Sequence, residues 1–107
     1  MIDIRYNIKD YTVSIDGHAG SAEKGNDLIC AAVSALAHTL EANLRQLESV
    51  GALEKMAADL TDGKGWFEFV PLVGNAAFVR HTVTAICVGF EMLAQQAQDY
   101  ITYKVVA

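Results

Sequence analysis

The hydrophobic pattern of this chain changes its period near Asp27, and the change limits the folds that the chain can adopt. Before that residue, apolar and polar side chains alternate in two short stretches, 2–6 and 11–16, as in half-buried strands. The mostly polar residues 7–10 between them predict a tight turn, so the two strands should pair antiparallel. After Asp27, apolar residues recur every three or four positions, which predicts a helix that ends near Glu48 or Gly51. Its apolar stripe consists of Ile29, Val33, Leu36, Leu40, Leu44 and Leu47.

The second half of the chain repeats this order of elements. Residues 52–60 suit a helix as well as a strand, and we favour a strand because a turn signal at 62–65 and an aromatic stretch at 66–70 follow. Pro71 should end that hairpin, and Asn75 can cap a second helix. The apolar stripe of this helix consists of Val79, Val83, Ile86, Phe90, Leu93 and Ala97. The last stretch, 100–106, should form a short closing strand or an extended tail.

The order of elements predicts an α+β fold. We expect a two-layer ββαββα domain with a mainly antiparallel sheet and both helices packed on one face. A chain of 107 residues with 52% apolar composition can bury one core, so residues 1–107 should form a single domain.

The net charge of the chain and the lack of a signal or membrane segment limit the partners and the compartment that we expect. The net charge of −5, with only eight scattered Lys and Arg residues, argues against nucleic-acid binding and favours a basic peptide as partner. The sequence has no charged-then-apolar signal at its start and no apolar run near the ~20 residues that span a bilayer. We therefore expect a cytoplasmic protein without membrane contact, in which Cys30 and Cys87 are free thiols.

A cysteine and a histidine form the main candidate site. Cys30 falls in the first turn of the predicted helix, where unpaired amides and the helix dipole favour thiolate over thiol. His18 follows the second strand and can take or return the proton. The loop 17–27, with glycines at 17, 20 and 25, allows the two to meet and a ligand to approach closely. The pattern predicts a catalytic Cys-His dyad.

Two further residues have competing interpretations. Asp27 either caps the helix, a role open to Asn26 as well, or orients the imidazole as the third member of a triad. Ser34 lies one turn beyond Cys30 beside a patch of alanines that leaves room for a peptide backbone. Its hydroxyl either contacts substrate or bonds the helix carbonyl at Cys30.

Other interpretations of the cysteines and histidines also remain open. A small buried hydrophobe among alanines is an equally open interpretation of Cys30. Two cysteines and three histidines also allow a redox or zinc protein, but the chain has no CxxC or HxxxH pair, so we expect no metal. Cys87 should pack in the core, and His38 and His81 should face solvent or serve structural roles.

The stretch GHA, a glycine-containing loop and then DLICAAVSAL resembles the ribosomal-processing cysteine protease family, Prp. The resemblance implies a cytosolic endopeptidase, usually a homodimer, that needs no cofactor. It implies that Cys30 is the nucleophile and His18 the base, with Gly17, Asp27 and Ser34 supporting the site and the loop 17–27 covering the substrate.

The family's known substrate is the N-terminal extension of large-subunit ribosomal protein twenty-seven. It is cut after aromatic residues and before a small residue and a basic stretch, and some relatives process phage proteins with a similar motif. The alternative is a non-catalytic peptide-binding module of the same fold, acting as a ribosome or phage accessory protein.

Overall fold

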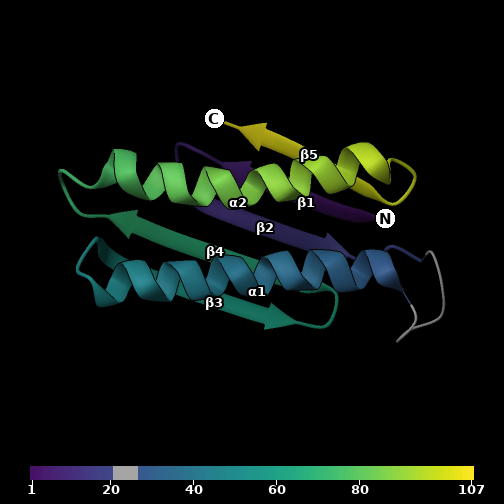
Figure 1. Cartoon of the computed structure of the whole chain (residues 1–107), viewed down its shortest axis with the longest axis horizontal. Helices are drawn as coiled ribbons and strands as arrows, with labels where there is room; N and C mark the ends of the chain where they lie inside the picture. Colours follow the sequence, from purple (N-terminus) through teal and green to yellow (C-terminus); the bar gives the residue numbers. More distant parts are fainter. Residues whose placement is uncertain (21–26) are drawn as a thin grey trace.

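A computed structural model describes residues 1–20 and 27–107 of the chain. It contains five strands and two helices in these residues (Figure 1): β1 (Ile2–Asn7), β2 (Thr12–Gly17), α1 (Leu28–Ser49), β3 (Leu53–Thr61), β4 (Lys64–Pro71), α2 (Ala76–Gln96) and β5 (Ile101–Val106). The predicted ββαββα order is confirmed. The last stretch, for which a strand and a tail were both open, is a strand.

The strands form one sheet in the order β3-β4-β2-β1-β5. All neighbouring pairs are antiparallel except β1 and β5, which run parallel. The turn of the first hairpin contains a local hydrogen bond in which the Asp10 amide donates to Asn7 Oδ1 at 2.9 Å. The mainly antiparallel α+β prediction is therefore confirmed.

Residues 52–60, which fit either element, are strand for a tertiary reason. β3 lies at the sheet edge and pairs with β4 in a register that sets Met56 opposite Phe69 and Ala58 opposite Phe67. Its inward-facing side chains are only half-buried beyond Leu53, so the alternation in the sequence is weak. The aromatic partner strand therefore decides the conformation.

Both helices cover the same face of the sheet (Figure 1), as predicted. The buried side of α1 packs over β3 and β4, and that of α2 packs over β5. The buried helix residues are Val33, Ala37, Leu40, Leu44 and Leu47 from α1 and Val79, Val83, Cys87 and Phe90 from α2. They meet Ile4, Tyr6, Val13, Phe67 and Phe69 of the sheet. This packing brings the end of β2 and the start of α1 to the same end of the molecule (Figure 1).

The outer side of α2 has little cover. By length and composition alone α2 could cross a membrane, with a mean hydropathy of 1.3 over its most apolar window and 22% of that window buried. Phe78, Val88 and Met92 are each more than half exposed. The helix therefore buries one face in the core and leaves an apolar strip on the other.

Candidate active site

Cys30 lies in the first turn of α1, as the sequence predicts. Asp27 is the N-cap, and its Oδ1 accepts hydrogen bonds from the amides of Ile29 and Cys30, both at 3.0 Å. The cap thus binds the backbone amide of Cys30 and holds it in place. The side chain of Cys30 is half-buried and lines a cavity. Of the two interpretations of Asp27, capping is the one that these hydrogen bonds demonstrate.

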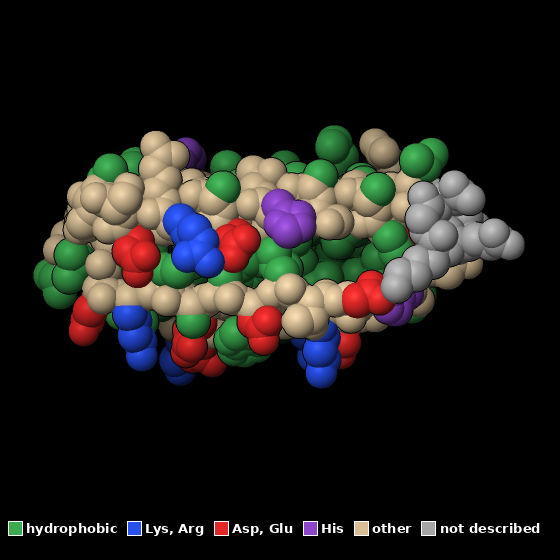
Figure 2. Space-filling model, turned by 90° about the horizontal axis from the view of Figure 1, so that it is seen from below, with side chains coloured by type: hydrophobic (Ala, Val, Ile, Leu, Met, Phe, Trp, Pro, Cys, Tyr) green, Lys and Arg blue, Asp and Glu red, His purple; other side chains and the backbone are tan. Residues whose placement is uncertain are grey.

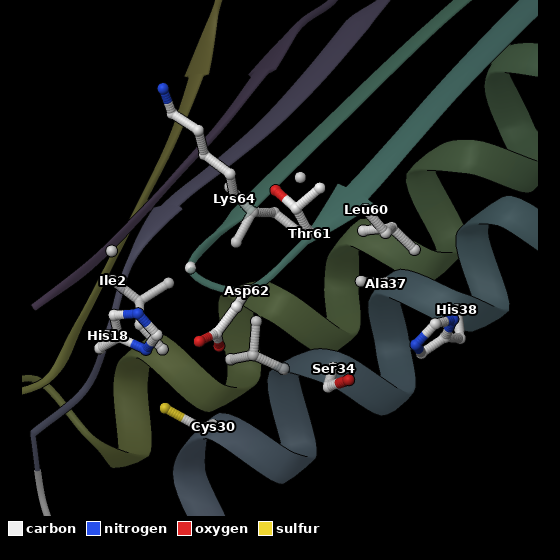
Figure 3. A pocket seen from close by; sticks show the side chains of 15 residues that line it. Ile2, His18, Cys30, Ser34, Ala37, His38, Leu60, Thr61, Asp62 and Lys64 are labelled. Carbon is white, nitrogen blue, oxygen red and sulfur yellow. The ribbon is translucent and has the colours of Figure 1, made fainter. Parts of the chain in front are cut away.

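His18 follows the last residue of β2, and its neighbour contacts Cys30 directly. The Ala19 amide donates to Cys30 Sγ at 3.4 Å, which joins the end of β2 to the start of α1. Figure 3 shows the sulfur of Cys30 directed toward the imidazole of His18. Two residues that are separated along the chain therefore face one space, as the predicted dyad requires.

That space is a cavity of about 370 Å³ at the end of the sheet, and His18 and Cys30 both line it. Gly17 and Ser34, predicted as supporting residues, line it as well, whereas Asp27 does not. Its apolar walls come from Ile2, Ile15, Val33, Ala37 and Leu60. Figure 2 shows apolar side chains in the hollow between the helix layer and the sheet layer. The cavity can therefore hold an apolar side chain next to a thiol.

Ser34 is exposed and forms part of the cavity wall. Among the described residues, no hydrogen bond joins its hydroxyl to the Cys30 carbonyl, so the helix does not occupy it in that way. The predicted substrate cover, 17–27, includes residues 21–26, among them Gly25 and Asn26, which lie outside the described residues.

Several cavity residues were not singled out as site residues from the sequence, among them His38 and Asp62. His38, expected to face solvent or serve a structural role, is exposed and lines the cavity two turns beyond Cys30. The spacing of Cys30, Ser34 and His38 by four residues places them on one helix face and could have revealed this. Asp62 comes from the turn between β3 and β4, and only the tertiary fold brings it here.

The second thiol has very different surroundings. Cys87 is 1% exposed in the middle of α2, as its predicted core role requires. Burial raises the pKa of its thiol to about 12, although a hydrogen bond with Tyr103 opposes part of that rise. Both cysteines are free. Across residues 1–20 and 27–107, no three His, Cys, Asp or Glu side chains are grouped to hold a metal ion.

The fold places a helix-start thiol and an imidazole on one open cavity, an arrangement that is typical of cysteine-dependent hydrolases. The chain belongs to the family of the cysteine protease Prp, whose model matches residues 1–102. It is therefore a cysteine protease, and the resemblance seen in the sequence is confirmed.

Solved structures share the fold. The ribosomal processing protease Prp from S. aureus, in complex with a covalently linked product peptide, is 20% identical with a TM-score of 0.73 and covers 98% of this chain and 99% of its own. A second structure of that protease holds a substrate peptide and has a TM-score of 0.67 at 19% identity, with coverage of 98% and 99%. SMU.848 from Streptococcus mutans is 27% identical with a TM-score of 0.65, covering 98% of this chain and 91% of its own. A search of the curated proteins found no match.

Replacing the N-cap should separate its structural role from a catalytic one. Asp27→Ala removes both cap hydrogen bonds and should lower the free energy of unfolding by about 1 kcal/mol, whereas Asp27→Asn keeps an acceptor and should lose only a few tenths. Urea unfolding followed by circular dichroism measures both. If Asp27 acts only as a cap, Asp27→Asn retains peptide cleavage; a loss of cleavage in a fully stable Asp27→Asn would instead show that the charge is needed.

The two thiols should react differently with iodoacetamide. A pKa of about 12 leaves Cys87 protonated and shielded at about pH 8, so the folded protein should take up one adduct, on Cys30. In concentrated guanidinium chloride it should take up two. Intact-protein mass spectrometry gives the count, with Cys30→Ser as the control that takes up none when folded. Rapid labelling of Cys87 in the folded protein would contradict its placement in the core.

Proposed function

We propose that this chain is an endopeptidase in which Cys30 is the nucleophile and His18 the base. The observation that supports this most strongly is the single cavity that both side chains line, with the sulfur directed toward the imidazole (Figure 3). The imidazole takes the thiol proton as sulfur attacks the scissile carbonyl, then returns it to the leaving amine. Water hydrolyses the resulting thioester and restores both groups.

The backbone amides around the two residues differ in whether they are available to a substrate. The amide of Cys30 already donates to Asp27, so it is not the free donor that would stabilise an oxyanion. The Ala19 amide, which donates to Cys30 Sγ at 3.4 Å, is a described donor close to the reacting atoms. We assign Gly17 and Ser34, which line the cavity, to contact with the substrate backbone.

The substrate that we propose is the N-terminal extension of large-subunit ribosomal protein twenty-seven, or a phage protein with a similar motif. The apolar cavity walls suit the aromatic residues that precede such a cut. The net charge of −5 suits the basic stretch that follows it. The fold-matched S. aureus protein is a ribosomal processing protease and has been solved with substrate and product peptides.

We also propose a cytoplasmic homodimer that pairs through the outer side of α2. Phe78, Ala85, Val88 and Met92 follow one another at steps of seven, three and four residues, the spacing with which one helix packs against another. Phe78 and Val88 are 56% exposed and Met92 is 52% exposed. Pairing two such strips would remove this apolar surface from water.

Cleavage of a defined peptide tests the catalytic proposal. The wild-type protein should cut a peptide with paired aromatic residues, a small residue and a basic stretch, at the aromatic-to-small bond. Cys30→Ala should lower the rate by a factor on the order of 10³ or more, and His18→Ala by roughly 10² to 10⁴. Mass spectrometry locates the cut.

Cys87→Ala, which lacks the other thiol, is the matched control. Circular dichroism verifies that it is folded, and the folded variant should still cleave the peptide. Equal cleavage by Cys30→Ala would rule out Cys30 as nucleophile. Tight binding without cleavage by the wild type would favour the non-catalytic module.

A charge in the α2 strip tests the homodimer. Val88→Glu should convert the dimer to a monomer because it buries a carboxylate in the interface, as sedimentation equilibrium would show. Val50→Glu, at a valine after α1 that is 67% exposed against 56% for Val88, should remain dimeric. A monomeric wild type at micromolar concentration would reject the dimer, and co-sedimentation with lipid vesicles would contradict a purely cytoplasmic protein.

A further inference from the structure

The turn between β3 and β4 lies directly against His18. Strand β2 ends beside it, where the Gly17 amide donates to the Gly63 carbonyl at 2.9 Å. This hydrogen bond lies next to the last β2–β4 pair, Asp16 opposite Lys64, so it continues the contact between the two strands. The turn and the residue that precedes His18 are therefore tied to one another.

The imidazole of His18 rests on Gly63 itself. A Cβ atom added at Gly63 would lie 2.5 Å from His18 Nε2 and 3.2 Å from both Cδ2 and Cε1. Any larger residue would need the ring to move, because real Cβ atoms do not approach other atoms so closely. The absence of a side chain at position 63 thus leaves the space that the ring occupies.

The same turn also contributes a carboxylate to the cavity. Asp62 lines it, and Figure 3 shows its carboxylate directed toward His18. Asp27, the acid that the sequence suggested for this purpose, instead accepts two amides at the start of α1 and is not among the cavity-lining residues. Among the described residues, Lys64 also contributes a charged side chain to the cavity wall.

We propose that the β3–β4 turn is a third component of the catalytic site. Gly63 is a positioning residue that holds the His18 imidazole beside Cys30, and the Asp62 carboxylate stabilises the positive charge that the imidazole gains when it takes the thiol proton. This inference rests on the proposed Cys-His dyad. The third member of the site then comes from a hairpin turn and not from the helix cap.

Two glycine substitutions test the positioning role. Gly63 and Gly51 have nearly equal φ angles, +75° and +77°, but a Cβ at Gly51 meets nothing within 4 Å. Gly63→Ala and Gly51→Ala therefore both place alanine at a positive φ, and only the first displaces the imidazole. We expect Gly63→Ala to lower kcat by about 10- to 100-fold with little change in KM, and Gly51→Ala to stay within about twofold of wild type.

Alkylation of Cys30 gives a readout that needs no substrate. At about pH 7, Gly63→Ala should react with iodoacetamide several-fold more slowly than wild type, because the imidazole no longer holds the thiolate, whereas Gly51→Ala should not. Equal kinetics for the two glycine variants in both assays would overturn the positioning role. Thermal unfolding of each variant verifies that both are folded.

A second pair of variants tests the carboxylate and stays informative if Gly63→Ala does not fold. Asp62→Asn should lower kcat on the order of tenfold or more. Asp59→Asn is the matched control. Asp59 is an exposed residue of β3 that lies opposite Trp66 of β4, and removing its charge should leave kcat unchanged. Equal activity of the two would overturn the role of Asp62. A wild type that cuts no peptide would mean that the proposed function fails, whereas an active wild type with these variants unimpaired would reject the turn alone.

Discussion

The packing of α1 on the sheet is the constraint on which the site depends. Its buried stripe, with Val33 and Ala37 among its first members, fixes the rotation of the helix about its axis. Once Val33 and Ala37 point into the core, Ser34 and His38, one position further along, must point to the edge of the sheet. Cys30 lies one turn before Ser34 on the same face. The core therefore determines which α1 residues can face a substrate, before any catalytic group is considered.

The elements themselves could largely be predicted from the sequence, because the apolar period changes from two to about three and a half at Asp27. The secondary structure was ambiguous in the segments whose apolar pattern is weak and whose conformation is decided by tertiary pairing. Residues 52–60 become β3 because an aromatic strand lies beside them, and 101–106 become β5 because the edge of β1 is free to pair. A local pattern contains no information about such partners.

The residues of the candidate site, like the elements of the fold, could be predicted only in part from the sequence. Cys30 and His18 could be singled out from their predicted places at a helix start and a strand end, and the structure places both on one cavity. Asp62 and Gly63 could not, because the sequence shows only a turn signal there, and the contact with His18 exists only after β4 pairs with β2. His38 is intermediate, since its helical spacing from Cys30 was visible but its exposure to a cavity was not.

The two cysteines have different surroundings because they occupy different positions along their helices. Cys30 occupies the first turn, half-buried, beside the Ala19 amide and in the field of the helix start. Cys87 occupies the middle of α2, where burial raises the pKa of its thiol and the amides of a helix interior bond within the helix. A thiolate needs donors and access, and among the described residues the side chain that hydrogen-bonds to Cys87 and lowers its pKa is Tyr103. The fold thus keeps one cysteine available for chemistry and the other for packing.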